Sequence, residues 1–356
     1  MHFKIRNTYT EIEGTETEIQ KAKDMFTFQY PYWQRGKGKR PELKFRMLCY
    51  LKYNRFPTGW IRRIMNEGFD NTFEDLRKPV GRKLAFPHNL PKLRPEYQTP
   101  AVQLAINSER GIIHHCTGAG KTVIMAHLIH ALPHPTLILV PSLNLLNQNY
   151  KEMCKFFSKD VVGIIGEGKW EPNYITISTV QTLWSHMKKE SEDLKKFFKQ
   201  IDMLLIEEAH HINTGSYTLQ NSYFKICMHL NARYRFGLTA TPGDEKSIER
   251  DLLEGVTGRV IHEVKSSQLI KWGYLTQPKI KMINCFMNPI HDWKLAYDKN
   301  ILENKDRNKK IVDAARVYAN QGKSVLITVT RVKKHGRVLL EALPESRFMS
   351  GSTTGV

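Results

Sequence analysis

Short apolar runs alternate with helical patterns along the chain from residue 92 to about residue 275. The runs are rich in Ile, Leu and Val and are bounded by polar residues or Pro; they cover 136–140, 161–165, 174–177, 203–206 and 234–238. Between the first two runs, apolar residues recur at helical spacing, as Leu143, Leu146 and Tyr150 do, and Val102, Ala105 and Ile106 form a similar pattern before the first run. Strands that alternate with helices are typical of an α/β fold with a parallel sheet. The pattern therefore predicts an α/β domain over residues 89–275.

The chain before this domain carries a different pattern. Phe3 and Ile5 alternate with polar residues, which predicts an edge strand, and residues 16–25 show helical spacing. Residues 43–53 alternate apolar and basic side chains as a half-exposed strand would. We therefore predict a small α+β domain over residues 1–88.

A further unit begins after the α/β domain, at residue 276. Residues 309–319 have a helical pattern, and the apolar run 324–330 predicts a strand. Residues 276–356 are too few for a complete α/β domain. We expect them to form the start of a second domain of the same class, incomplete in this chain.

The chain is strongly basic, with 54 Lys and Arg residues against 35 Asp and Glu and a formal net charge of +19. Such an excess favours a polyanionic partner, nucleic acid first and an anionic membrane surface second. No apolar run approaches the roughly 18 residues that span a bilayer, and the amino terminus lacks a signal-peptide core. Five scattered cysteines without a C-x-x-C pair indicate a reducing compartment. We expect no membrane partner and a cytoplasmic location.

The basic excess is distributed along the chain, and the first domain carries one local cluster of basic residues. An aromatic cluster at 26–33 is followed by a loop that contains Arg35, Lys37, Lys39 and Arg40. Aromatic rings can stack on bases, and Lys and Arg can contact phosphates. The loop therefore predicts DNA contacts, and the alternative is a solvated basic loop on a small structural domain.

A Gly-rich stretch joins an apolar strand pattern to an apolar helical pattern in the second domain. Gly118 and Gly120 let backbone N–H groups face a phosphate with no Cβ in the way. Lys121 can reach the β- and γ-phosphates, and the Thr122 hydroxyl can coordinate Mg²⁺. The candidate phosphate-binding residues are Thr117, Gly118, Ala119, Gly120, Lys121 and Thr122. His115 stands where the general P-loop pattern has its first Gly, so an ordinary turn is the alternative.

Polar residues follow two other buried strand patterns. Glu207 and Glu208 come at the end of the run 203–206, and Thr239 and Thr241 follow the run 234–238. The carboxyl ends of parallel strands are where such sheets bind ligands. Paired carboxylates there can serve a phosphate-bound Mg²⁺ and activate a water, whereas the alternative is a solvated pair of charges.

With these residues in order, the chain resembles superfamily 2 helicases. It is similar to the phage UvsW-type helicases in particular, through the turn at 53–59 and Arg307-Asn308-Lys309. The segments that match the superfamily motifs are 117–122 for motif I, Glu-Glu-Ala-His at 207–210 for motif II, Thr-Ala-Thr at 239–241 for motif III, 141–143 with Gln148 for motif Ia, 178–182 for motif Ib, Tyr97-Gln98 for the adenine-sensing element and 325–333 for motif IV.

The resemblance implies a fold and a set of residue roles. It implies a RecA-like parallel sheet domain, a partial second RecA-like domain and a small amino-terminal α+β domain. ATP would be bound by 117–122 with Gln98 on adenine, and Mg²⁺ by Thr122 and Glu207. Glu208 would be the general base, with Lys121, Glu207 and His210 completing the catalytic set. Thr239 and Thr241 would couple nucleotide state to lobe movement, and DNA would contact Pro141, Ser142, Thr179, Gln181 and Arg331.

The resemblance also implies an activity. It implies an ATP-dependent DNA helicase or translocase that acts on branched, forked or single-stranded DNA in recombination, repair and replication. Such a protein would work as a monomer, with possible recombination or replication proteins as partners, in the host cytoplasm if a phage encodes it. The alternatives are a DNA-binding protein with an incomplete or inactive ATPase, and a restriction or repair motor subunit.

Two departures from the family pattern bear on activity. Glu207 stands where the family has Asp, which lengthens the arm that faces Mg²⁺; on this basis Glu207→Asp is expected to raise ATP turnover. The chain reaches Val356 before motifs V and VI, where the family has its arginine finger. We therefore expect this chain by itself to bind ATP and DNA but to hydrolyse ATP slowly.

Overall fold

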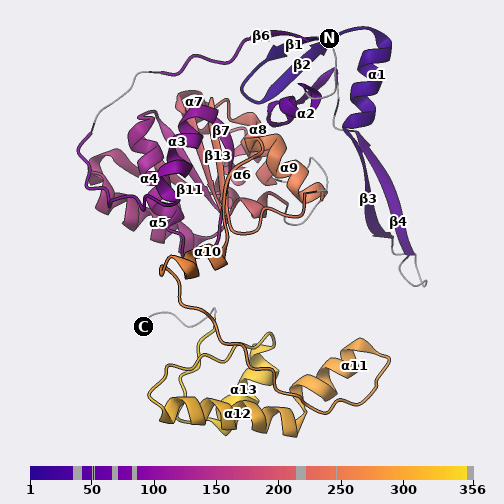
Figure 1. The fold of residues 1–356 in the computed structure, drawn as a ribbon, viewed down its shortest axis with the longest axis vertical. Coiled ribbons are helices and arrows are strands. Elements are labelled where there is room, and N and C mark those ends of the chain that lie inside the picture. Colours follow the sequence, from indigo (N-terminus) through magenta and orange to yellow (C-terminus); the bar gives the residue numbers. More distant parts are fainter. Residues whose placement is uncertain are drawn as a thin grey trace. The chain divides into compact units, whose positions relative to one another are not determined.

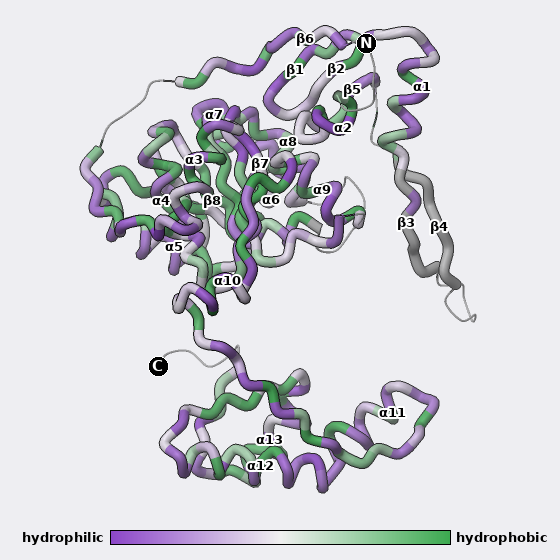
Figure 2. Tube along the Cα trace, viewed as in Figure 1, coloured by the Kyte–Doolittle hydropathy of each residue, from purple (hydrophilic) through white to green (hydrophobic). Residues whose placement is uncertain are grey.

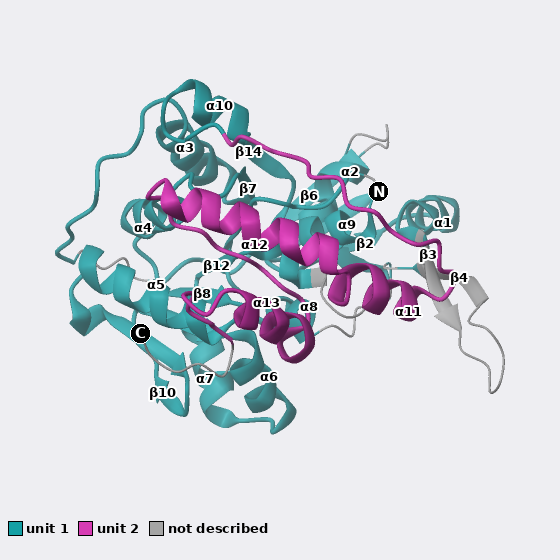
Figure 3. Cartoon of the chain, turned by 90° about the horizontal axis from the view of Figure 1, so that it is seen from below, with its two compact units in different colours: residues 1–277 teal, residues 278–356 magenta. Residues whose placement is uncertain are grey.

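A computed structural model describes residues 1–34, 42–49, 51, 53–65, 71–81, 86–213, 222–245 and 247–350. The chain forms two compact units, residues 1–277 and 278–356 (Figure 3). The first unit contains a large sheet and a small sheet, and the second is helical in its described residues.

The large sheet is the centre of the first unit. Its strand order is β10-β9-β11-β8-β12-β13-β7-β14, and every neighbouring pair is parallel except β10 with β9. The predicted α/β fold with a parallel sheet is thus confirmed. The strands are β7 (Arg110–His115), β8 (Thr136–Val140), β9 (Val162–Gly166), β10 (Lys169–Glu171), β11 (Ile175–Thr179), β12 (Met203–Glu207), β13 (Tyr234–Thr239) and β14 (Val260–Val264).

Helices cover both faces of this sheet, which explains why the strands β8 and β12 carry apolar residues toward both faces. On β8, Leu137 and Leu139 belong to one buried cluster, while Ile138 and Val140 belong to the other. Green, apolar stretches are visible in the sheet region of the first unit in Figure 2. One face packs on α3 (Gln98–Ser108), α4 (Lys121–Ala131) and α5 (Leu143–Phe156), and the other on α6 (Val180–Lys188), α7 (Glu192–Gln200), α8 (Ser222–His229) and α9 (Ile248–Thr257) (Figure 1).

The small sheet lies at the amino terminus and has the strand order β5-β2-β1-β6. The edge strand predicted around Phe3 and Ile5 is wrong, because β1 pairs with β2 on one side and with β6 on the other. The strand β6 comes from far along the chain, so local alternation could not reveal it. The elements are β1 (His2–Ile5), β2 (Tyr9–Glu13), β5 (Arg55–Pro57), β6 (Thr72–Asp75), the predicted helix α1 (Glu16–Met25) and the short α2 (Ile61–Met65).

Two further strands form a separate antiparallel ribbon that extends from α1 (Figure 1). They are β3 (Thr27–Gln34) and β4 (Glu42–Cys49), paired from Thr27 with Cys49 to Gln34 with Glu42. The ribbon leads to the predicted basic loop. Lys37, Lys39 and Arg40, together with Arg35, lie outside the described residues.

The small sheet is fastened to the large one by a buried tryptophan. The ring of Trp60 is fully buried, and its Nε1 donates to the main-chain oxygen of Asp251 on α9 at 2.8 Å. A Cβ on Gly59 would lie 1.9 Å from the main-chain oxygen of Glu254, so only glycine fits at this approach. Arg63 adds ion pairs to Asp251 and Glu254.

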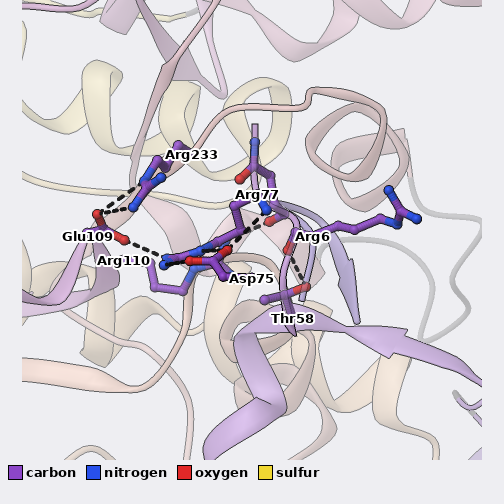
Figure 4. Close-up of polar contacts among 8 residues, drawn as sticks. Arg6, Thr58, Asp75, Arg77, Glu109, Arg110 and Arg233 are labelled. Carbon is purple, nitrogen blue, oxygen red and sulfur yellow. Dashed lines mark hydrogen bonds and ion pairs between the residues drawn. The ribbon is translucent and has the colours of Figure 1, made fainter. Parts of the chain in front are cut away.

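A second group of polar contacts joins the sheets at the amino-terminal end of β7 (Figure 4). Glu109 accepts from Arg77 of the small domain and from Arg233 of the large one, the latter at 2.8 Å. Arg110 donates to the main-chain oxygen of Asn7 at 2.6 Å. The small domain therefore forms one compact unit with the large sheet.

We expect Trp60→Ala to lower the free energy of unfolding of the first unit by about 3–5 kcal/mol, because it removes a buried ring and leaves a cavity. Urea unfolding followed by circular dichroism measures this loss. Tyr53→Ala is the control: Tyr53 is 95% exposed, so its truncation should change the stability by less than about 0.5 kcal/mol. Equal stability of the two variants would show that the junction is not tightly packed.

The regular secondary structure of the second unit is helical over its described residues, 278–350, and its α-helices are joined by extended stretches. They are α11 (Trp293–Tyr297), α12 (Lys305–Asn320), which contains the predicted helix 309–319, and α13 (Arg337–Ala342). The strand predicted over 324–330 is wrong: no strand forms among the described residues of this unit. A strand needs neighbouring strands to satisfy its backbone groups. Leu326 is accordingly 85% exposed.

Candidate nucleotide-binding and DNA-contact site

The Gly-rich stretch lies between β7 and α4, at the carboxyl edge of the large sheet. Gly118 and Gly120 have φ values of 83° and 74°, which glycine adopts without strain. A Cβ on Gly120 would lie 2.6 Å from Nε2 of Gln98, so a larger residue there would displace the end of the Gln98 side chain. The two glycines thus have the backbone conformation found in phosphate-binding loops, in which successive N–H groups form a concave anion site.

His115 occupies the first Gly position of the general pattern without closing the loop. Its side chain is buried, and its Nε2 lies 2.8 Å from Nδ1 of His262 on β14. Burial lowers the pKa of His115 to about 3, so the ring is neutral at physiological pH. The departure from the pattern is accommodated within the sheet.

Gln98 fastens the loop from the other side. Its Nε2 donates to the main-chain oxygen of Ala119 at 2.9 Å, and its Oε1 accepts from the backbone N–H of Arg94 at 2.9 Å. The Tyr97 hydroxyl donates to the same Ala119 oxygen at 3.0 Å. Both ends of the Gln98 amide are therefore engaged with the protein, and its contact with adenine stays a prediction.

Four residues predicted from three separate motifs, namely Lys121, Glu208, His210 and Thr239, meet beside the loop. Lys121 Nζ lies 3.8 Å from Oε1 of Glu208, and Oε2 of Glu208 lies 3.4 Å from Nδ1 of His210. The same His210 nitrogen lies 2.9 Å from Oγ1 of Thr239. Thr239 Oγ1 also accepts from the backbone N–H of Thr241 at 3.1 Å. The parallel order β12-β13-β7 brings these residues to one edge.

Glu207 lies deeper than Glu208. It ends β12, its side chain is buried, and it accepts a hydrogen bond from Nδ2 of Asn149 on α5. Burial raises the pKa of Glu207 to about 7. The sequence analysis did not single out Asn149. The signal was a polar residue three positions after Leu146 and four before Met153, on the buried face of the helix.

The oxygen donors at this edge fit a magnesium ion that is shared with phosphates. Thr122 supplies a hydroxyl on the first turn of α4, and Glu207 supplies a carboxylate. Among the described residues, no group of three or more His, Cys, Asp or Glu side chains could hold a metal alone. Mg²⁺ is commonly held by one or two protein oxygens together with substrate phosphates, so the residues fit Mg²⁺ bound with ATP.

The contact with Asn149 changes the expected effect of Glu207→Asp. Shortening the arm by one methylene removes the carboxylate from the Asn149 amide, and a hydrogen bond to a charged group contributes roughly 1.5–3 kcal/mol. We therefore expect Glu207→Asp to lower ATP turnover by about tenfold or more. Turnover against Mg²⁺ concentration, and thermal unfolding of the nucleotide-free protein, are the measurements.

Asn149→Ala and the double variant complete a mutant cycle for this pair. If the contact carries the effect, the double variant should lose little more than either single variant, because the two residues act through one bond. Additive losses would show that Glu207 works independently of Asn149. If the Glu207→Asp protein instead hydrolyses ATP faster than the wild type, the expectation drawn from the family pattern is correct and the role given to Asn149 is wrong.

The residues predicted to contact DNA in the first unit also come together. Ser142 and Thr179 cap the amino termini of α5 and α6, and each accepts a hydrogen bond from the backbone of its own helix. Thr179 pairs in register with Val140, next to Pro141. Gln181 Nε2 donates to the main-chain oxygen of Pro141 at 3.0 Å. Arg331 belongs to the second unit, where its guanidinium lies 5.2 Å from the ring centre of Tyr297.

Known proteins match the stretch that builds this site. Residues 91–244 match the family described as Type III restriction enzyme, res subunit. The chain is 29% identical over 203 residues to the DNA 3'-5' translocase XPB2 of Sulfurisphaera tokodaii, with 57% of this chain and 42% of that protein covered. It is 31% identical over 163 residues to the DNA 3'-5' helicase XPB of Kineococcus radiotolerans, with 45% and 28% covered. The chain thus spans less than half the length of these relatives.

These matches confirm the predicted resemblance to superfamily 2 DNA helicases. The fold is similar to that of the bacteriophage T4 helicase UvsW. One UvsW crystal structure superposes with a TM-score of 0.55 at 19% identity, covering 99% of this chain and 75% of that one. A second gives a TM-score of 0.53 at 20% identity, covering 73% and 99%.

No helix among the described residues is long and apolar enough to cross a membrane.

Proposed function

We propose that this chain is the ATP-binding part of a DNA helicase or translocase. The observation that carries the proposal is the contact chain Lys121–Glu208–His210–Thr239 beside the Gly-rich loop. Residues from three motifs meet there although they lie far apart in the sequence. The sequence matches to DNA translocases and helicases support the same class.

The proposed roles follow from the positions of the side chains. The backbone of 117–122 would hold the phosphates of ATP, and Lys121 would add positive charge to them. Thr122 and Glu207 would hold Mg²⁺, which neutralises phosphate charge when bound. Glu208 is in contact with a cation and partly exposed, so it can accept a proton from an attacking water.

The contacts of His210 indicate how a structural change at the bound nucleotide could be transmitted to the neighbouring strand β13. A single ring nitrogen, Nδ1, lies 3.4 Å from the carboxylate of Glu208 and 2.9 Å from the hydroxyl of Thr239. A movement of the Glu208 carboxylate would therefore shift the His210 ring, and with it the hydroxyl of Thr239 and the following loop, which contains Thr241. This loop leads into α9, the helix that carries the small domain through Asp251.

The test of the proposal is ATP turnover with and without DNA. Phosphate release should rise when single-stranded or forked DNA is added, and the rise should disappear at high salt as the phosphate contacts are lost. Displacement of a labelled strand then distinguishes a helicase from a translocase. Tight DNA binding without any turnover would favour the second candidate, a DNA-binding protein with an inactive ATPase.

We further propose that the preferred DNA is branched or forked, as in recombination, repair and replication restart, and that the protein acts as a cytoplasmic monomer. The similarity in fold to UvsW, the net charge of +19 and the ribbon that leads to the basic loop support this finer proposal. The family description of residues 91–244 keeps a restriction motor subunit as the alternative. Cleavage of DNA in the presence of a nuclease partner would favour that alternative.

Replacing Arg35, Lys37, Lys39 and Arg40 by Gln should weaken the binding of forked DNA. Each lost phosphate contact should make the slope of log K against log salt shallower by roughly 0.9 for duplex DNA. Fluorescence anisotropy with a forked duplex at four salt concentrations measures the slope. The matched control replaces Lys188, Lys189, Lys195 and Lys196, an equal number of cations on and beside α6 and α7. If only the control variant changes the slope of log K against log salt, the DNA contacts α6 and α7 and not the basic loop.

A further inference from the structure

A pocket opens at the carboxyl edge of the large sheet, between the loop after β8 and the helices α6 and α8. Its volume is about 380 Å³, within the usual range for small-ligand sites of roughly 300–1,000 Å³. The described residues that line it come from four separate segments: Pro141, Ser142, Leu145, Val180, Gln181, Trp184, His211, Ser222 and Tyr223.

The centre of interest in this pocket is the indole of Trp184, which is half-buried on α6. The ammonium of Lys225 lies 5.6 Å from the centre of the ring, so the aromatic system already carries a cation–π contact. Trp184 lies one helical turn after Val180 and three residues after Gln181. The ring is therefore held by the same helix whose amino terminus carries the predicted DNA contacts.

The charge of the pocket suits a polyanion. None of the described lining residues is an Asp or Glu, and His211, Gln181 and Ser142 supply polar atoms. Gln181 is tied to the main chain of Pro141, which joins the two segments that border the opening. The helices α5 and α6 both begin here, and their amino termini attract negative charge. Phosphates are thus favoured beside the opening and a flat aromatic group within it.

We propose that this pocket receives one unstacked base of a bound single strand and that Trp184 is the stacking platform. The proposal rests on the proposed function, because it requires the strand to pass over Pro141, Ser142 and Thr179. Stacking of a base on an aromatic side chain contributes roughly 1–3 kcal/mol and tolerates every base. Trp184 would therefore increase affinity without selecting a sequence.

The experiment compares two oligonucleotides and two tryptophans. Binding of a single strand of thymidines, and of the same length of abasic backbone, is measured by fluorescence anisotropy. Trp184→Leu, which keeps an apolar side chain but removes the ring, should weaken binding of the thymidine strand by about 5- to 100-fold. Its binding of the abasic strand should stay close to that of the wild type, and its salt slope should not change, because no phosphate contact is lost.

Trp170→Leu is the matched control. Trp170 is also half-buried and packs on α6 through His186, at a ring distance of 4.3 Å, but it does not line the pocket. Its replacement should lose similar packing and leave the discrimination between the two strands intact. Trp184→Phe should recover most of the lost affinity, since a phenyl ring can also stack.

The remaining outcomes distinguish failure of the stacking proposal from failure of the proposed function. If Trp184→Leu distinguishes the thymidine strand from the abasic strand as well as the wild type does, the stacking proposal is wrong while the proposed function stands. If the wild-type protein binds neither strand and its ATP turnover ignores DNA, the proposed function fails as well. A parallel loss for both strands would assign Trp184 a structural role and overturn the proposal.

Discussion

A Glu208→Gln protein should bind ATP with nearly unchanged affinity and hydrolyse it about 10²- to 10⁴-fold more slowly. General base catalysis contributes a factor of this size, and glutamine cannot accept the proton of the attacking water. The carboxylate of Glu208 lies within 3.8 Å of Lys121 and 3.4 Å of His210, so it is the carboxylate in contact with the loop. Its side chain is more exposed than that of Glu207, and water can reach it.

Nucleotide affinity and turnover must be measured separately to test this role. Equilibrium binding of a fluorescent ATP analogue reports the first, and phosphate release with saturating DNA reports the second. Glu171→Gln, at the exposed end of β10, is the matched control and should behave as the wild type does. If the Glu208→Gln protein hydrolyses ATP at the wild-type rate, the assignment of Glu208 as the general base is wrong.

Lys121→Ala should abolish tight ATP binding, with a loss of affinity of about 100-fold or more. The Lys121 side chain is only 9% exposed, and its Nζ donates to the main-chain oxygen of His115 at 3.4 Å, at the start of the loop. Charge-assisted hydrogen bonds to phosphate are about twice as strong as neutral ones. Removing the ammonium also leaves the carboxylate of Glu208 next to the phosphates without a cation.

Isothermal titration of ATP into the nucleotide-free protein measures this loss. Lys169→Ala on the exposed strand β10 removes an equal charge from the same unit and should leave ATP affinity unchanged. Similar losses in both variants would mean that the general field of the protein, and not the contact at the loop, attracts the nucleotide. If the Lys121→Ala protein keeps the ATP affinity of the wild type, this loop does not bind the phosphates of ATP.

Much of this molecule could be predicted because its local patterns repeat. Strands such as β8 and β12 are apolar on both faces, and the strand patterns alternate with helical ones, so the parallel α/β fold followed from periodicity. The Gly-Ala-Gly-Lys-Thr segment identified the loop because the positive φ values at Gly118 and Gly120 require glycine there. Strand ends carry the Glu207–Glu208 pair and Thr239, and parallel strands place their carboxyl ends at one edge.

What the local patterns could not predict depends on partners far along the chain. The strand β1 is interior because β6 comes from residues 72–75 to pair with it, and residues 324–330 form no strand because no neighbouring strand pairs with them in the described residues. Trp60 gave no signal of its contact with Asp251, which lies 191 residues away.

The chemistry of the site divides in the same way. The sequence by itself determined the residue types and the order of the motifs, because phosphate, Mg²⁺ and a general base each require particular side chains. Only the tertiary structure decided that Asn149 holds Glu207, that Gln98 already binds the loop at both ends of its amide, and that Trp184 faces a pocket beside Ser142. Those contacts join separate helices and loops, and their geometry is set by the packing of the sheet between two layers of helices.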